Sequence, residues 1–378
     1  MVKSNQTLAL SLLLVLIELV SLPAPSCQEI DFNVWVKNQP TNPGKDVGCM
    51  KKDPALSSAE INKVTNIIDP ATELRPEDGS YKTISESIAN IPDGSTRRYV
   101  LILKAGAVFR EKLFLNRSKP FVTIRSEDPN NPAVIVWNDT ATTPGKDGKP
   151  LGTDGSSTVT IESDYFIAYG VVFKNDAPLP KLGENKGEAP ALRVLGTKAI
   201  FYNCTIDGGQ GALYDQKGLH YFKSSVIKGT IDFIFGSAKS FYEDCTIIST
   251  YKEITTLPMA PLQQQQRNNP IKDAPGESGF SFKTCTFKGE GENIYLGRVG
   301  TPVVYSYSDI GKEIMPIISI GGIVQLAERT GFYCADFKSY GPGLPKMLSE
   351  DLTYAEATPF LGTYFISGDT WILSIPPE

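Results

Sequence analysis

Histidine is nearly absent from this sequence: His220 is the only one among 378 residues. This excludes a metal centre built from several histidines. The chain also lacks the G-x-S-x-G elbow of serine hydrolases, the phosphate-binding P-loop and the dinucleotide-binding G-x-G-x-x-G pattern. Because His220 lies in a strand-like segment, Leu219 to Phe222, we expect a structural role for it and no catalytic triad.

Positive charge is not in excess either. Lys and Arg number 37 against 42 Asp and Glu, a net charge of −5, so we expect no nucleic-acid partner, since such proteins need a basic face. Beyond the N-terminus, no apolar run approaches the roughly 20 residues of a membrane-spanning helix, so no membrane association is expected. The 41% hydrophobic content is too high for a disordered chain and suffices for a large core.

Residues 1–26 have the pattern of a secretory signal peptide. Lys3 precedes an apolar stretch from Leu8 to Leu22, and small residues after it offer a cleavage site. The stretch is too short to span a bilayer. We therefore predict a secreted protein of the extracellular space or cell wall, with residues 27–77 as an N-terminal extension.

Secretion permits disulfides and N-linked glycans. Sequons for glycosylation begin at Asn116 and Asn138, whereas a third, at Asn203, is discounted because it falls inside a strand-like run. Three of the six cysteines occupy equivalent positions of a repeat and are interpreted as small buried hydrophobic residues: Cys204, Cys245 and Cys285.

An internal repeat of about 20 residues determines the predicted architecture. The segment Phe201-Tyr-Asn-Cys-Thr-Ile206 recurs, with the same alternation of apolar and polar residues, at Phe222 to Ile227, Tyr242 to Ile247 and Phe282 to Phe287. Short strands at this spacing, without helices between them, indicate a solenoid. We predict an all-β fold, a right-handed parallel β-helix, whose coils bury their inward residues on one another.

Other segments complete the expected fold. Short amphipathic helices at Thr83–Asn90 and Thr353–Phe360 are expected to cap its ends, and Ser58–Ile67 is expected to form a helix in the N-terminal extension. The segment from Tyr251 to Gly279, which contains the four glutamines at Gln263–Gln266, is interpreted as an insertion. Earlier strand-like runs are Tyr99–Leu103, Val122–Arg125, Val134–Val136, Thr158–Ile161 and Phe166–Phe173.

Two charged residues lie in apolar, strand-like surroundings. Asp232 interrupts the run Gly229-Thr-Ile-Asp-Phe-Ile-Phe-Gly236, and Arg298 ends Tyr295-Leu-Gly-Arg298. A carboxylate in such a place must be paired or hydrogen-bonded, and a guanidinium partner would keep it ionised and aimed as a nucleophile. A structural ion pair between coils is the alternative. The long groove of a β-helix suits an extended polymer, and in secreted proteins that polymer is usually a polysaccharide.

The run from Gly229 to Gly236 resembles the signature of the plant pectinesterases, or pectin methylesterases, which reads G-x-[IV]-D-F-I-F-G. The resemblance extends from about residue 78 to residue 371, so residues 78–378 are expected to form one pectinesterase-like β-helix domain. Four more segments resemble family patterns: Ala105 to Glu111, with Phe109 in place of a tyrosine, Ala191 to Arg193, Leu213 to Gly218, and Leu296 to Arg298.

The resemblance implies hydrolysis of the methyl esters of homogalacturonan in pectin, with release of methanol and with no cofactor or metal. Asp232 would be the nucleophile that forms an acyl-enzyme, Arg298 would orient it, and Gln210 would stabilise the oxyanion. Phe109 and Phe233 would contact the substrate. We expect a monomer.

Three positions depart from the family's pattern. Gly211 stands where the family has its acid–base aspartate, Glu188 where it has a second oxyanion glutamine, and Val299-Gly300 where it has Pro-Trp. Loss of a catalytic acid lowers a rate by about 10²–10⁴-fold, so a slow enzyme is expected. Two alternatives stay open: a homologue that binds pectin or an extracellular partner without turnover, and a pectate lyase, which would need a cluster of calcium-binding carboxylates.

Glu188 offers a way to replace the missing acid. The repeat register places Glu188 one coil before Gly211 and Asp232 one coil after it, and the glycine would leave space beside Asp232. A protonated Glu188 could then hydrogen-bond the oxyanion or deliver a proton to the departing methanol. In the competing interpretation Glu188 is a solvated residue in an inactive site.

Overall fold

A computed structural model describes most of the chain from Lys63 onwards. The predicted signal peptide, Cys27, Cys49 and most of the 27–77 extension lie outside the described residues. The described ranges are 63–72, 76–179, 187–251, 260–265, 278–291, 294–298, 303–318, 334–344 and 350–372.

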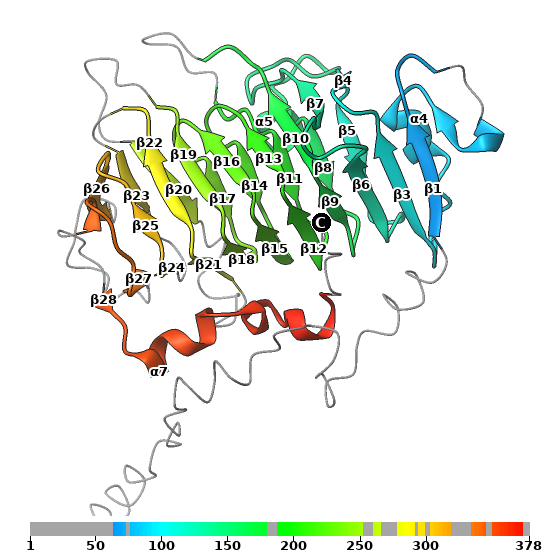
Figure 1. Cartoon of the computed structure of the whole chain (residues 1–378). Coiled ribbons are helices and arrows are strands. Elements are labelled where there is room, and N and C mark those ends of the chain that lie inside the picture. Colours follow the sequence, from blue (N-terminus) through cyan, green and yellow to red (C-terminus); the bar gives the residue numbers. More distant parts are fainter. Residues whose placement is uncertain are drawn as a thin grey trace, which may run out of the picture. The chain divides into compact units, whose positions relative to one another are not determined.

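Three parallel sheets wind through these residues, and successive coils contribute one strand to each sheet (Figure 1). Sheet A has 12 strands, and sheets B and C have eight each. A strand pairs with the strand one coil later, as β12 (Ala199–Tyr202) does with β15 (Leu219–Lys223), and not with its neighbour in sequence. The prediction of a right-handed parallel β-helix is confirmed.

The strands are short, as the repeat predicts. The remaining strands of sheet A are β2 (Ser80–Tyr81), β1 (Lys63–Ile68), β3 (Arg98–Leu103), β6 (Val122–Ser126), β9 (Ile167–Tyr169), β18 (Lys239–Glu243), β21 (Gly279–Lys283), β24 (Val303–Ser306), β27 (Cys334–Phe337) and β28 (Glu350–Asp351). Sheet B contains β4 (Val108–Phe109), β7 (Ala133–Trp137), β10 (Val171–Asn175), β13 (Thr205–Asp207), β16 (Val226–Gly229), β19 (Thr246–Ser249), β22 (Thr286–Gly289) and β25 (Asp309–Ile310). Sheet C contains β5 (Leu113–Leu115), β8 (Val159–Ile161), β11 (Leu192–Val194), β14 (Leu213–Asp215), β17 (Ile234–Gly236), β20 (Ala260–Gln265), β23 (Ile294–Arg298) and β26 (Ile314–Ile318).

The core consists of ladders of like side chains, one from each coil. On sheet A the rings of Phe201 and Phe222 stack at 4.7 Å, those of Phe222 and Tyr242 at 4.7 Å, and those of Tyr242 and Phe282 at 4.5 Å. Each aromatic pair adds about 0.5–1.5 kcal/mol beyond the burial of its area. The repeat is therefore visible in the sequence because every coil presents the same inward position to the coil above it.

The corners between sheets A and B explain the polar residues of the repeat. Asn203, Ser224, Asp244 and Thr284 all have φ between 50° and 55°, in the left-handed region that turns the chain. The prediction that Asn203 lies inside a strand is therefore wrong, because it is an exposed corner residue. The residue after each of three of these corners is a buried free cysteine, as predicted: Cys204, Cys245 and Cys285.

Helix α4 (Ile84–Ala89) confirms the first predicted cap. Thr83 closes a capping box with Glu86, and the carboxylate of Glu111 accepts hydrogen bonds of 2.9 Å from the backbone N–H groups of Ile84 and Ser85. A carboxylate at this end compensates the unpaired N–H groups and the positive end of the helix dipole. Glu111, part of the segment that resembles the family, thus ties β5 to the helix and is a structural residue.

The C-terminal segment covers a face of the solenoid. Helix α7 (Tyr354–Ala357) begins at Thr353, as predicted, and the segment continues through three 3-10 turns, η4 (Thr358–Phe360), η5 (Thr363–Ile366) and η6 (Gly368–Thr370), which lie along the strands of sheet A (Figure 1). Phe365, Ile366 and Trp371 pack with Tyr221 and Phe241 in a second hydrophobic core. The expectation that this segment caps an end is therefore corrected. Two further short helices are η1 (Pro76–Asp78) and α5 (Gly152–Ser156).

Three other boundaries differ from the predictions. Lys63–Ile68 is a strand that pairs along its whole length with β3, so the helix predicted at Ser58–Ile67 is wrong over its described part, and the β-helix begins before residue 78. Three of the four glutamines of the expected insertion, Gln263–Gln265, lie in β20, which pairs with both β17 and β23, and Gln266 lies outside the described residues. The single run predicted at Phe166–Phe173 is two strands that part at Gly170, with φ of 60°.

Candidate active site

Asp232 lies at the corner between β16 and β17, and not within a strand as the sequence suggested. Its φ is 46°, and its exposed fraction is 6%. Aspartate is among the few residues that adopt this conformation readily. The corner presents one carboxylate where sheet B turns into sheet C.

The glycines of the signature run are required by the packing of this corner. A Cβ at Gly229 would lie 2.2 Å from Cβ of Phe233, and a Cβ at Gly236, where φ is 139°, would lie 1.9 Å from the carbonyl oxygen of Asp215. Neither position has room for a side chain. The spacing of the motif therefore reflects how tightly the coils approach on both sides of Asp232.

The structure brings together three of the four polar positions that the sequence analysis singled out. The backbone N–H of Ala189 donates to the carbonyl of Gln210 at 2.8 Å, and that of Gly211 donates to the carbonyl of Ile231 at 3.1 Å. Glu188, Gln210 and Asp232 thus lie at corresponding corners of three consecutive coils, in the order that the repeat predicts. β11, β14 and β17, which follow these corners, are neighbours in Figure 1.

The expectation that Gly211 leaves space beside Asp232 is wrong. A Cβ at this residue would lie 2.9 Å from Cε1 of Phe235, 3.1 Å from Cγ of Glu188 and 3.2 Å from Cβ of Glu188. The glycine has φ of 66°, close to that of Asp232 in the next coil. The position of the family's aspartate is therefore filled by the stem of Glu188 and the edge of a phenylalanine ring.

Glu188 is half-buried and is held from outside the coil. The hydroxyl of Thr153, in helix α5, donates a hydrogen bond of 3.0 Å to Oε2 of Glu188. The next residue of the helix, Asp154, forms an ion pair of 3.1 Å with Arg193, whose Nη1 also donates to the Asp154 carbonyl at 2.8 Å. Helix α5 thus connects Glu188 to the outer face of sheet C.

An aromatic pair on that outer face escaped the sequence analysis. The rings of Tyr214 and Phe235 stack at 4.2 Å between β14 and β17, and the Arg193 guanidinium lies 5.5 Å from the centre of the Tyr214 ring. Burial, followed by the charge of Asp154, raises the pKa of Tyr214. Both rings are partly exposed. They form a partly exposed aromatic platform that begins three residues after Asp232.

Phe109 and Phe233, the aromatic residues predicted to contact substrate, do not reach the surface. Their exposed fractions are 3% and 0%, and both belong to the main hydrophobic core. In β4 the exposed side chain is that of Val108, so Phe109 points inward. For Phe233 the prediction is wrong because the corner at Asp232 shifts the alternation of the strand. Phe233 points inward, whereas Phe235, two residues later, points outward.

Arg298 ends β23 on sheet C. Its backbone pairs with Gln264 of β20, and Gln264 pairs with Phe235 of β17, so Arg298 follows the Asp232 corner by two coils along the sheet. The side chain of Arg298 lies outside the described part of the chain, and its predicted contact with Asp232 stays a prediction.

His220 is structural, as predicted. It is fully buried, Nδ1 contacts Oδ1 of Asp215, and Nε2 donates to the carbonyl of Gly196 at 2.8 Å. The hydroxyl of Tyr242 donates to Oδ2 of the same aspartate at 2.6 Å. The cluster connects three coils inside the solenoid and is not exposed at its surface.

Within the described ranges, no three side chains of the metal-ligating types gather into a group that could hold an ion. This part of the chain also contains no helix that is both long and apolar enough to cross a membrane.

The chain superimposes on solved structures of pectin methylesterases. The enzyme from carrot superimposes with a TM-score of 0.65 and 24% identity, over 82% of this chain and 94% of that chain. PemA from Erwinia chrysanthemi superimposes with a TM-score of 0.67 and 22% identity, over 82% and 98% of the two chains. These likenesses show the fold, a right-handed parallel β-helix, and in this chain one of its corners carries a carboxylate.

The sequence comparison is more specific. The Pectinesterase family model matches residues 74–347. Pectinesterase QRT1 of Arabidopsis thaliana is 35% identical over 302 residues, which are 78% of this chain and 76% of that protein. Pectinesterase 2 of Olea europaea is 33% identical over 334 residues, which are 86% and 84% of the two chains. The chain belongs to the pectinesterase family, which confirms the resemblance predicted from the sequence.

Proposed function

We propose that this protein hydrolyses the methyl esters of homogalacturonan, converting pectin and water to pectate and methanol, and that it does so slowly. The observation that carries the proposal is the Asp232 corner. A carboxylate of the family's signature run is held there in a left-handed conformation, and three residues later Phe235 joins Tyr214 on the outer face of sheet C.

The reaction begins with attack of Asp232 on the carbonyl carbon of the ester. The bond between this carbon and the methoxyl oxygen breaks, methanol leaves, and an acyl-enzyme anhydride remains until water hydrolyses it. Gln210 donates its side-chain amide to the oxyanion, and Arg298 keeps the aspartate ionised and oriented. The edges of Tyr214 and Phe235 pack against the apolar face of a sugar ring, a contact worth about 1 kcal/mol.

The proposed setting is outside the cell. A signal peptide at residues 1–26 would direct the chain to the cell wall, where it would act on pectin as a monomer. Asn138 is exposed and open to a glycan. Asn116 accepts hydrogen bonds from the backbone N–H of Ser118 at 2.9 Å and from its hydroxyl at 2.6 Å. We propose that both asparagines carry glycans.

The test is methanol release from highly methylated pectin by the purified protein, with Asp232→Asn as the matched inactive control. We expect the wild-type chain to release methanol and the variant to release none. Equal values for the two proteins would contradict the proposal. Unsaturated products that absorb in the ultraviolet would instead identify a lyase.

The absence of a side chain at Gly211 favours a second candidate, a homologue that binds pectin without turnover. Phe235 and Glu188 fill the space in which the family's acid–base aspartate would lie, so the acid–base step would be lost. Pectin could still bind to the platform of Tyr214 and Phe235. Retention of the wild-type protein on immobilised pectin, together with no release of methanol, would establish this alternative. Methanol release that depends on Asp232 excludes it.

A further inference from the structure

Glu188 and Gly211 form a matched pair. The family has an aspartate at the second position, and here the stem of Glu188 passes within 3.2 Å of the point where the first carbon of that aspartate would lie. A carboxylate has thus been removed from one coil, and another has been introduced on the preceding coil at the same corner of the solenoid. The two changes leave one carboxylate at these corners in addition to Asp232, on the coil that precedes Gln210.

The contacts of Glu188 are those of an oriented group. It is half-buried, and its Oε2 accepts the 3.0 Å hydrogen bond from Thr153, which leaves Oε1 for a proton. The negative charge of Glu188 also contributes to the raised pKa of Tyr214, after burial and Asp154. The carboxylate therefore lies within electrostatic range of the aromatic platform on the outer face of sheet C.

We propose that the acid–base function has moved from position 211 to Glu188, with Thr153 as its positioning residue. This inference rests on the proposed esterase function and names the residue that transfers its proton. Unlike the family's glutamine, a glutamate at this position can donate a proton and take one back.

The proton balance closes over the two half-reactions. In the first, protonated Glu188 gives its proton to the methoxyl oxygen as the C–O bond breaks, so that methanol leaves and the acyl group stays on Asp232. In the second, ionised Glu188 takes a proton from the water that attacks the acyl carbonyl. The galacturonate carboxyl and free Asp232 are released, and Glu188 is protonated again.

Glutamine is the family's own residue at this position, so Glu188→Gln separates the two roles that the sequence allows. A glutamine still donates to an oxyanion but cannot transfer a proton. We expect methanol release from methylated pectin to fall by about 10²-fold or more in kcat, with KM nearly unchanged. Glu162→Gln, a carboxylate on another coil, is the matched control and should keep the wild-type rate.

Thr153 supplies a test that leaves the carboxylate in place. Thr153→Val removes the hydrogen bond at nearly constant volume, and we expect kcat to fall about 10-fold, with a shift of the pH–rate profile, because the proton on Glu188 is no longer held in place. Thr153→Ser should restore both. Thr246→Val, on sheet B, is the control and should change neither the rate nor the profile.

The outcomes are distinct. A Glu188→Gln protein as active as the wild type, while Asp232→Asn is inactive, overturns this inference and leaves the proposed function standing. No methanol from the wild-type chain overturns both. If Glu188→Gln fails to fold, the pH–rate profile of Thr153→Val decides, and a profile identical to that of the wild type overturns the inference.

Discussion

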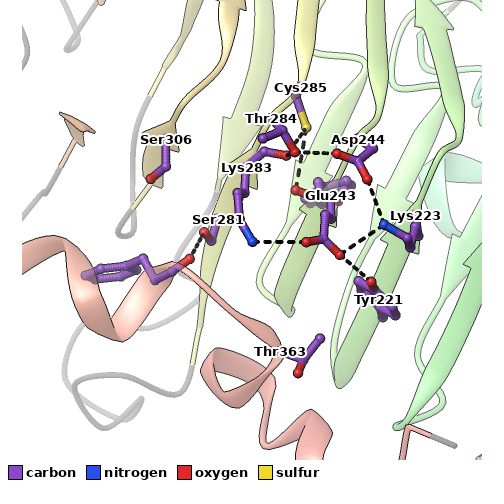
Figure 2. A network of polar contacts seen from close by, with 12 residues as sticks. Tyr221, Lys223, Glu243, Asp244, Ser281, Lys283, Thr284, Cys285, Ser306 and Thr363 are labelled. Carbon is purple, nitrogen blue, oxygen red and sulfur yellow. Dashed lines mark hydrogen bonds and ion pairs between the residues drawn. The ribbon is translucent and has the colours of Figure 1, made fainter. Parts of the chain in front are cut away.

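Two groups of carboxylates on this solenoid have opposite surroundings. On sheet A, Glu243 accepts hydrogen bonds from Tyr221 at 2.5 Å, from Lys283 at 3.1 Å and from Lys223 at 3.3 Å, all within one ladder of adjacent coils (Figure 2). At the corner that carries Glu188, the described residues give its carboxylate one hydrogen bond, from Thr153. The first group is neutralised from both neighbouring coils, and the second is held on one side.

The difference shows how one architecture serves stability and chemistry. Burial opposes the ionisation of Glu243, yet Lys283, the Tyr221 hydroxyl and Lys223 together lower its pKa. Asp244 at the adjacent corner is held likewise by Lys223 at 2.7 Å and by the hydroxyl of Thr284. A carboxylate locked in this way cannot exchange a proton near neutral pH. The proton-transfer role proposed for Glu188 requires a carboxylate outside such a cage, and among the described residues the carboxylate of Glu188 accepts only the hydrogen bond from Thr153.

The largest effect is expected at the Asp232 corner. Asp232→Ala removes the proposed nucleophile, so methanol release should fall by on the order of 10⁴-fold or more while the fold persists. Thermal unfolding of the purified variant provides the control for folding. Unchanged methanol release from a folded Asp232→Ala protein would refute the assignment of the nucleophile.

Arg298 should behave as a partner that cannot be replaced by a simple positive charge. Arg298→Ala should lower kcat by about 10²-fold or more, because Asp232 loses its orientation and part of its ionisation. Arg298→Lys should restore little, since one ammonium does not reproduce the planar fork of a guanidinium. Arg110→Lys, in an exposed ion pair with Asp176, is the control. Wild-type rates from Arg298→Lys would contradict the proposal that the Arg298 guanidinium orients Asp232.

Glu243 tests the other side of the comparison. Glu243→Ala leaves two lysines and a tyrosine hydroxyl without their shared acceptor, and we expect a loss of about 3 kcal/mol in the free energy of unfolding. Urea denaturation measures this loss, and methanol release below the transition should be unaffected. Asp93→Ala removes an exposed carboxylate that pairs with Lys119, and it is the control that should cost much less than Glu243→Ala. Equal losses of unfolding free energy in the two variants would contradict a stabilising role for the charged ladder of Tyr221, Lys223, Glu243 and Lys283.

Acid should weaken the ladder before it weakens the aromatic core. The pKa values of Glu243 and Asp244 are lowered from ordinary values of 4.5 and 3.8, so their contribution is complete above those values and is lost as the pH falls through the lowered ones. Asp336, whose pKa is raised by burial, acts in the opposite sense. The melting temperature should therefore fall steeply below about pH 4.5, and less steeply in Glu243→Gln. Parallel profiles for the two proteins would exclude this ladder as the cause.

The smallest effect concerns the filled space at Gly211. Gly211→Asp forces Phe235 and Glu188 apart, and we expect a destabilisation of roughly 1–3 kcal/mol, measured by urea denaturation. Aspartate tolerates the backbone conformation, as Asp232 shows at φ of 46°, so the loss reflects crowding. Adding Glu188→Ala, which removes the crowding stem, should recover part of it. No recovery would place the strain at Phe235 alone.

Much of the fold was predictable because it repeats. Each of these repeating coils places an aromatic ring at the same inward position. The recurrence of a phenylalanine at positions 201, 222 and 282 therefore predicted strands that stack on one another. β1 was missed because its residues also fit a helical pattern, and only the pairing of Lys63–Ile68 with β3 selects the strand. Local pattern and long-range pairing disagreed there, and pairing prevailed.

The composition of the site was predictable, but its geometry was only partly so. The motifs named Asp232 and Gln210 as candidates, and the structure places them at corresponding corners in the order that the repeat predicts. In a regular strand, side chains two residues apart lie on the same face, which would put Phe233 and Phe235 together. The positive φ of Asp232 at the corner instead turns Phe233 inward and leaves Phe235 outward. A backbone turn of this kind leaves no signal in the alternation of residues.

By itself, the sequence determined the solenoid, the family and the identity of the carboxylates, because these depend on repetition and on residue type. Only the tertiary structure decided which aromatic rings lie on the outer face of sheet C, what fills the place of the missing aspartate and which hydroxyl holds Glu188. Those answers depend on contacts between coils and with helix α5, where residues such as Thr153 and Glu188, 35 positions apart in sequence, meet. Their distance in sequence hides the contact that their packing creates.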